Sequence, residues 1–338
     1  MVHHEVSPDR FGHLRHPLYG LLEEYSLDIS YGFVSALAIP HKLQNPKRDI
    51  AVMNSSFSGW GSGLLGVLIF SGSLPATRVA VGGLEPFFLT SVRAVIAAAL
   101  ALVLLTLFKQ KRPSRRDLRS LGIVALGVVV GFPLLTALAL QHITAAHSIV
   151  FIGLLPLATA AFGVLRGGDC PRLLFWVFSV LGSSAVVGFA LTQSAEASLI
   201  GDMFMVAAVV ACGLGYAEGA VLSRRLGGWQ VICWALILAF PLMAVFATVT
   251  RPETLAGLKI SVWLSLGYVS VFSMLVGFVF WYRGLALGGT AGVGQLQLLQ
   301  PFFGLILAAM LLAEPIAPSM IGVTIFVVVC VAGAKRFA

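Results

Sequence analysis

Two charged residues, Arg93 and Glu218, lie well inside long apolar stretches of this 338-residue chain. Arg93 stands eight residues into the stretch 85–108, which in a helix is on the order of 12 Å from the end. Its guanidinium is suited to binding a substrate carboxylate or phosphate. The alternative is a structural role, in which Arg93 pairs with helix-end carbonyls or with Glu85. A charge in apolar surroundings is unfavourable, so both interpretations require a partner.

Glu218 is the only carboxylate well inside an apolar stretch. Such a group could bind a substrate amine or carry a coupling proton. Alternatively, it pairs with Arg224 or Arg225, about 9 Å further along the same helix. Tyr216, two residues before Glu218, points to a different helix face and is either a ligand or a packing or interfacial residue.

The stretches 261–281 and 290–312 carry the densest set of uncharged polar side chains. Gln297 and Gln300 are three residues apart and share a helix face, whereas Gln295 lies on another. Amides in apolar surroundings must hydrogen-bond to a neighbouring helix or to a bound molecule. These glutamines are therefore either helix–helix contacts or binding residues.

Two prolines stand in the middle of apolar stretches, Pro156 and Pro301. A proline inside a helix removes a backbone donor and frees the carbonyl four residues earlier, here that of Ile152 and of Gln297. Both helices are therefore predicted to kink. Kinked helices at corresponding positions are a pointer to a transporter's binding site.

Trp281 and Tyr282 close the stretch 261–281, where aromatic residues of the membrane interface are expected; a gate is the alternative. No metal or cofactor is expected. His142 and His147 are five residues apart, which does not align two ligands on one helix face, and the cysteines show no metal-ligand spacing.

The composition of the chain indicates which kind of structure positions these residues. Hydrophobic residues make up 58% of the chain and charged residues 11%, against roughly 25% charged in soluble domains. Soluble enzymes, disordered regulators and secreted disulfide scaffolds are thereby excluded. The formal net charge of +8 does not indicate nucleic-acid binding, because the basic residues lie in short connections between apolar stretches. We expect an all-α polytopic membrane protein.

Apolar stretches of about 20 residues, enough for a helix to cross a bilayer, recur from Gly61 onward. Ten spans are predicted, at 61–81, 85–108, 120–140, 146–165, 173–192, 202–222, 229–249, 261–281, 290–312 and 319–334.

The Lys and Arg residues of the connections predict the orientation. The connections after the even-numbered spans hold thirteen of them, against only Arg251 and Lys259 on the opposite side. Both termini are therefore expected in the cytoplasm, with the protein in the plasma membrane (the inner membrane of a bacterium).

Residues 1–57 differ from the rest, with five of the seven histidines and no stretch long enough to span a bilayer. We expect a disordered tail or a segment upstream of the true start, with Met53 as the alternative start. The remaining chain divides into two five-helix units, 58–195 and 201–336.

A shift of 145 residues aligns features of these two units. Gly82-Gly83 falls on Gly227-Gly228, Pro156 on Pro301, and Asp169 on Glu314. Because five spans is an odd number, the second unit must cross the membrane in the opposite sense to the first. Inverted repeats of this kind are typical of secondary transporters, with the substrate site near the midplane.

From about residue 59 to its end, the chain resembles the EamA family of the drug/metabolite transporter superfamily. The matching features are Gly61; Pro86 and Arg93; Gly215-Tyr216; Arg224-Arg225; Trp281-Tyr282-Arg283-Gly284-Leu285-Ala286; Gln300-Pro301; and Glu314-Pro315. The resemblance implies secondary transport of small metabolites, often export of amino acids or related compounds. The small multidrug-resistance branch of the superfamily uses a Glu in its first helix for proton exchange, and the span 61–81 has none.

We therefore expect a transporter rather than an enzyme, with a small-molecule substrate, the lipid bilayer as its environment, and alternating access of a cavity lined by spans 1–4 and 6–9. The chain has no GxxxxGK[ST] motif, so the driving force would be a proton, another ion or a substrate gradient. The alternatives are a non-transporting receptor or scaffold and an intramembrane enzyme. The oligomeric state is not readable from the sequence.

Overall fold

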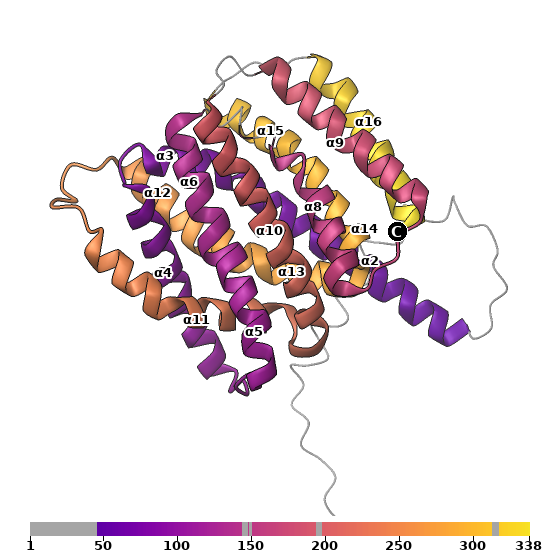
Figure 1. Ribbon diagram of the computed structural model, residues 1–338, viewed down its shortest axis with the longest axis horizontal. Helices are drawn as coiled ribbons and strands as arrows, with labels where there is room; N and C mark the ends of the chain where they lie inside the picture. Colours follow the sequence, from indigo (N-terminus) through magenta and orange to yellow (C-terminus); the bar gives the residue numbers. More distant parts are fainter. Residues whose placement is uncertain (1–45, 144–147, 149–150, 194–197, 313–317) are drawn as a thin grey trace, which may run out of the picture. The chain divides into compact units, whose positions relative to one another are not determined.

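The computed structural model describes residues 46–143, 148, 151–193, 198–312 and 318–338 (Figure 1). Every regular element in these ranges is a helix, and they contain no β-strand, as expected for the all-α class. The packing below is that of the unit from Ile50 to Ala338.

The first half of the described chain is made of short and long helices in sequence. They are α2 (Pro46–Ser71), α3 (Ser73–Val81), α4 (Pro86–Leu107), α5 (Arg115–Val124), the π-helix η1 (Ala125–Gly131), α6 (Phe132–His142), α8 (Leu155–Phe162), the π-helix η2 (Gly163–Gly167) and α9 (Leu173–Gln193).

The second half repeats this pattern. Its helices are α10 (Leu199–Leu226), α11 (Gly228–Val249), α12 (Ile260–Tyr268), the π-helix η3 (Val269–Val276), α13 (Gly277–Gly288), α14 (Thr290–Gly294), the 3₁₀-helix η4 (Gln295–Leu299), α15 (Gln300–Leu312) and α16 (Pro318–Phe337).

The described residues hold six helices that are long and apolar enough to cross a membrane. They run over Ser58–Val81, Pro86–Leu107, Arg115–His142, Leu199–Leu226, Gly228–Val249 and Ile260–Gly288. Shorter apolar helices cover Leu155–Gly167 and Leu173–Phe189. The chain is thus a multi-pass helical membrane protein, while the count of ten spans and the orientation of both termini stay predictions.

The helical chain begins earlier than the sequence indicated. α2 starts at Pro46, so residues 46–57, predicted as part of a disordered tail, are helical. A proline is well tolerated in the first turn of a helix because the N–H it lacks would have no partner there. Residues 1–45, including most of the predicted tail, lie outside the described residues.

The 145-residue offset also relates the starts of helices in the two halves. α5 and α12 begin at Arg115 and Ile260, and α6 and α13 begin at Phe132 and Gly277. The same offset separates the starts of α8 and α15, and of α9 and α16. The two π-helical segments η1 and η3 also correspond, so an irregularity of the backbone is repeated together with the helices.

Local sequence explains where several helices begin. Glu85 caps α4 by accepting a hydrogen bond from the Phe88 N–H (2.9 Å), and Pro86 follows as the first helical residue. Ser114 and Asp117 form a capping box at the start of α5. Gly227 separates α10 from α11 with φ = 95°, a value that L side chains rarely adopt.

Helices of opposite halves pack closely. α4 lies against α11, α10 against α6 and α8, and α3 against α12. The pair α9 and α16 lies side by side in Figure 1, in agreement with their contacts. Glycines allow one of these approaches, since a Cβ on Gly284 would come within 2.7 Å of the Gly63 Cα.

The two prolines do not kink continuous helices. Pro156 is the second residue of α8, after a turn at residues 153–154, and Pro301 is the second residue of α15, after the 3₁₀-helix η4. The predicted free carbonyl of Gln297 in fact accepts a hydrogen bond from the Gln300 N–H. The prediction of mid-helix kinks was therefore wrong in form, because each proline begins a new helix at the corresponding position.

Candidate functional site

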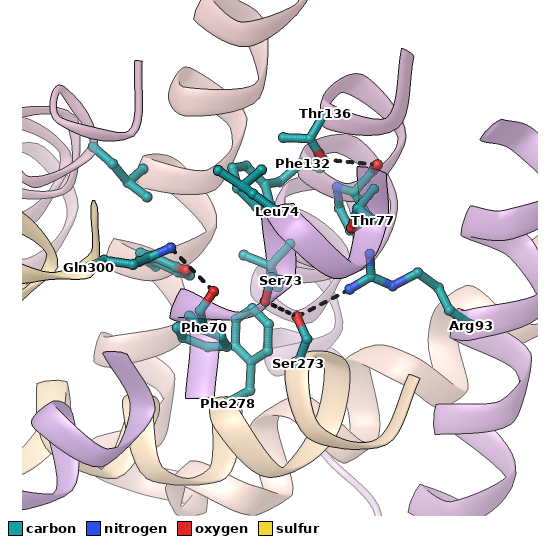
Figure 2. Close-up of a pocket in the computed structure, with 14 residues that line it drawn as sticks. Phe70, Ser73, Leu74, Thr77, Arg93, Phe132, Thr136, Ser273, Phe278 and Gln300 are labelled. Atoms are coloured by element: carbon teal, nitrogen blue, oxygen red, sulfur yellow. Dashed lines mark hydrogen bonds between the residues drawn. The ribbon is translucent and has the colours of Figure 1, made fainter. Parts of the chain in front are cut away.

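A buried cavity lies between the two halves of the chain (Figure 2). The first half contributes Phe70, Ser73, Leu74, Thr77, Arg93, Val128, Phe132, Pro133, Thr136 and Leu155, and the second half contributes Tyr216, Ser273, Phe278 and Gln300. Its walls come from α2, α3, α4, η1, α6 and α8 on one side and from α10, η3, α13 and α15 on the other.

The cavity contains a single buried cation, Arg93, among its lining residues. The side chain is 5% exposed, and its Nη2 donates to the Ser273 hydroxyl across the two halves (3.3 Å). The Ser73 hydroxyl also donates to Ser273 (2.7 Å), so the three polar groups converge at one wall, as Figure 2 shows. A serine hydroxyl does not neutralise a guanidinium.

No carboxylate of the described residues lies within ion-pair distance of Arg93, and its buried Nε has no hydrogen-bond partner there. The predicted partner Glu85 instead caps α4. Among the described residues, the hydrogen bond that Arg93 donates goes to the Ser273 hydroxyl rather than to a helix-end carbonyl, whereas Arg78 donates to the Leu140 carbonyl near the end of α6. Arg93 thus retains unused capacity to bind an anion.

Gln300 and Tyr216 are the other predicted residues that line the cavity. The Gln300 Nε2 donates to the Phe70 carbonyl at 3.5 Å, which is long for such a bond. The Tyr216 ring packs against Phe278 and Trp281, with centroid distances of 5.9 and 5.3 Å. Both residues combine a polar group with an apolar wall, as small-molecule sites commonly do.

Three pairs of equivalent positions from the two halves line this cavity. The 145-residue offset relates Val128 to Ser273, Pro133 to Phe278, and Leu155 to Gln300, and all six line the cavity. Two apolar residues of the first half thus correspond to polar residues of the second. Ser273 and Val128 lie in the two π-helical segments, a form of helix frequent at functional sites.

The space open to the centre of a water molecule in this cavity is about 30 Å³. A single water needs about 10–15 Å³ by this measure, so the cavity has room for only a few waters. The structure is therefore closed around the cavity, and a metabolite would need the walls to separate.

Three ion pairs join the two halves at another place, around the C-terminal part of α10. Arg166 pairs with Glu218 (2.8 Å), Arg224 with Asp169 (3.6 Å), and Arg225 with Asp117 (2.6 Å). In each pair one residue comes from the first half and the other from α10. Asp169 also accepts a hydrogen bond from the Ala291 N–H (3.1 Å) at the start of α14.

The predicted local partners of Glu218 are therefore wrong. Glu218 is 6% exposed, and its carboxylate pairs with Arg166 of η2 rather than with Arg224 or Arg225 of its own helix. Glu218 does not line the cavity, so the structure does not bring it together with Arg93.

Trp281 and Tyr282 are both fully buried, which differs from the expected position at the membrane interface. The Trp281 backbone packs on Gly66 of α2, and the Tyr282 hydroxyl donates to the Gly215 carbonyl (3.1 Å). They lie behind the cavity wall rather than in it. Their burial follows from the glycines of neighbouring helices, which leave room for large rings.

Gln295 and Gln297 are also fully buried and do not line the cavity. Within the described ranges, no hydrogen bond of good geometry satisfies either of their amide groups. Gln297 lies close to the Tyr216 hydroxyl, behind the cavity wall. Of the two glutamines expected to share a helix face, Gln300 lines the cavity and Gln297 does not.

The sequence reasoning missed Ser73, Thr77, Thr136 and Ser273, which supply much of the cavity's polar surface. Hydroxyl groups are common in apolar helices, where they bond to their own backbone, so they carry little signal. Thr136, for example, donates to the Phe132 carbonyl (2.7 Å). Among the described residues, no group of three His, Cys, Asp or Glu side chains could hold a metal ion.

A helical membrane protein whose two corresponding halves enclose a small, mostly apolar cavity with a few polar groups has the architecture of a transporter. The EamA-like transporter family matches this chain twice, over residues 58–191 and 199–334. The chain belongs to the EamA-like transporter family and is a membrane transporter by that membership.

Two relatives bear transporter names, and a solved structure shows the same fold. An uncharacterized transporter of Bacillus subtilis (strain 168), YdeK, is 62% identical over 286 residues, which is 85% of this chain and 100% of the relative. An uncharacterized transporter of Archaeoglobus fulgidus is 26% identical over 262 residues, 74% of this chain and 88% of that protein. One crystal structure has the same fold, with a TM-score of 0.69 at 17% identity over 83% of this chain and 99% of the other.

Proposed function

We propose that this protein is a secondary active transporter that exports amino acids or related small metabolites carrying a carboxylate. The observation that carries the proposal is Arg93, a buried cation without a described carboxylate partner in a cavity between the two halves. A substrate carboxylate would occupy the free positions of its guanidinium and remove the unfavourable burial of an unpaired charge.

The rest of the cavity would bind the remainder of such a substrate. Phe70, Phe132 and Phe278 offer apolar and aromatic surface, and the Thr77 and Thr136 hydroxyls and the Gln300 amide offer polar contacts. A single buried charge with an apolar surround selects for substrates with one dominant anionic group.

Alternating access of this cavity is the proposed mechanism. The three ion pairs of α10 would hold the two halves together at the end predicted to face the cytoplasm, and would break and re-form as the halves rock. In this mechanism Glu218 acts in closure through Arg166 rather than as a substrate ligand. A proton or another ion as the coupling partner remains part of the proposal.

The test is efflux from proteoliposomes loaded with a panel of labelled amino acids, in the plasma-membrane lipids of a bacterium. We expect efflux of at least one amino acid. In Arg93→Gln the efflux rate should fall by about tenfold or more, since one charge-assisted interaction with the substrate is removed. Glu218→Gln should also slow efflux by disturbing closure.

Arg251→Gln is the matched control, since Arg251 is an exposed cation outside the cavity and the ion pairs. Every variant is checked by its unfolding temperature, so that a folding defect is not read as a transport defect. Wild-type rates in folded Arg93→Gln and Glu218→Gln would remove both residues from the mechanism.

A further inference from the structure

A second cavity, separate from the one between the halves, is surrounded by cations. It is lined by Lys109, Gln110, Lys111, Arg225, Leu226, Gln230 and Trp234, and the space open to the centre of a water molecule is about 370 Å³. It lies where α4 ends and α11 begins, and it is much roomier than the central cavity. Of its three cations, only Arg225 has an ion-pair partner among the described residues, Asp117.

The backbone holds Lys109 in an unusual conformation at this cavity. The Lys109 N–H bonds to the Thr106 carbonyl and the Gln110 N–H to the Leu105 carbonyl, which together form a Schellman motif at the end of α4. Lys109 occupies the left-handed position of that motif (φ = 48°), where glycine is usual. It is the only non-glycine residue with positive φ in the described chain, so the strain falls on a cationic residue that lines the cavity.

The start of α11 adds further donors. Its N-cap is Gly227, and no side chain caps the first turn. The free backbone N–H groups of that turn carry the positive end of the helix dipole and favour an anion beside Leu226 and Gln230. Together with the two lysines, they make the cavity suited to a phosphate group.

The surroundings point to a lipid as the source of that phosphate. One face of the last two turns of α4 is exposed and apolar, with Leu102, Val103 and Leu107 each more than half exposed, as is Phe108 directly after the helix. Phe108 contacts Trp229 edge to face (centroids 5.6 Å apart), and Trp234 lines the cavity. Aromatic residues of this kind are typical of the membrane interface, and the exposed helix face offers a path for acyl chains.

We propose that this cavity binds the phosphate of an anionic phospholipid of the phosphatidylglycerol class, with Lys109 and Lys111 as its main cationic contacts and the acyl chains along α4. This basic pocket faces the side predicted to be cytoplasmic, where anionic headgroups attract Lys and Arg. The proposal does not depend on the transport activity, and its failure would leave the proposed function untouched.

The test is native mass spectrometry of the delipidated full-length protein, titrated with phosphatidylglycerol and, separately, with phosphatidylcholine. The wild type should bind one phosphatidylglycerol at least about tenfold more tightly than phosphatidylcholine, and the double variant Lys109→Gly/Lys111→Gln should lose that preference. Glycine is the residue that the Schellman motif favours, so the variant should fold at least as well as the wild type.

Lys259→Gln is the control, because it removes an exposed lysine from the opposite predicted side, and it should keep the wild-type preference. Unchanged phosphatidylglycerol binding in the double variant would overturn the proposal. So would displacement of the lipid by an equal concentration of inorganic phosphate, which would identify a soluble anion as the ligand instead.

Discussion

The central cavity and the C-terminal part of α10 differ in whether their buried charges have ion-pair partners. Around α10, the buried carboxylates Glu218 and Asp117 each have an arginine partner from the opposite half. In the cavity, Arg93 is as buried as those acids but is met only by the Ser273 hydroxyl. Both places lie between the same two halves, so the difference is not one of location in the fold.

The paired charges around α10 stabilise this structure, whereas the charge of Arg93 is left free to bind another group. Breaking a buried ion pair is strongly destabilising, because it leaves one charge buried without a partner. A buried charge that has no partner is already unfavourable, so its removal should not lower stability. Substitution of Arg93 should therefore lower transport without lowering stability, whereas substitution of an ion-pair residue around α10 should lower stability.

Arg93→Gln should reduce transport by about 10- to 100-fold, because the charge-assisted bonds to the substrate are worth about 1.5–3 kcal/mol. Its unfolding temperature in the same lipid should not fall, since the variant removes an unpaired charge. Initial efflux rates and thermal unfolding of the same preparation measure both. A large loss of stability would show that Arg93 has a structural partner, contrary to the comparison.

Arg166→Gln should lower the free energy of unfolding by about 1–3 kcal/mol, because it leaves the Glu218 carboxylate buried without its cation. The expected loss in the free energy of unfolding is smaller than for a fully buried ion pair, because the Arg166 side chain is 42% exposed. Denaturant unfolding of wild type and variant checks the figure. The double variant Arg166→Gln/Glu218→Gln is the control and should recover part of the loss, whereas equal destabilisation of single and double variants would count against the pair.

Asp117→Ala should destabilise by about 1–2 kcal/mol, through loss of the capping box of α5 and of the Arg225 pair. Arg225→Ala keeps the capping box, so it should cost less, about 1 kcal/mol or below, because Arg225 is 60% exposed. Comparing the two unfolding curves separates the cap from the ion pair. An equal effect of both variants would mean that the cap contributes nothing.

Lys109→Gly should stabilise the protein by about 1 kcal/mol, since glycine relieves the left-handed conformation at the end of α4. The measurement is thermal unfolding in a lipid without anionic headgroups, where the ammonium has no proposed ligand. Lys111→Gly, at an exposed position whose φ is not positive, is the control and should not stabilise. No gain at Lys109 would argue against strain there.

Part of the site was predictable because lipid makes intramembrane polar residues conspicuous. Arg93, Tyr216 and Gln300 were singled out by type and depth, and all three line the cavity. The all-helical class and the family likewise followed from composition and motifs, because long apolar stretches admit few other structures.

The rest depended on contacts between distant parts of the chain. Glu218 pairs with Arg166, 52 residues earlier, and no local spacing indicates that pairing. Trp281 has the type and position of an interfacial residue but is buried by the glycines of α2. Ser273 had no such signal, because its counterpart at the 145-residue offset is the apolar Val128 and the matching π-helical segments are seen only in the structure.

The central claim is that Arg93 binds the carboxylate of the transported molecule. The most direct test compares efflux of an amino acid with efflux of its carboxamide, by wild type and by Arg93→Gln, in the same proteoliposomes. We expect the wild type to prefer the carboxylate by about tenfold or more and Arg93→Gln to lose this preference. An undiminished preference in a folded Arg93→Gln protein would contradict this claim.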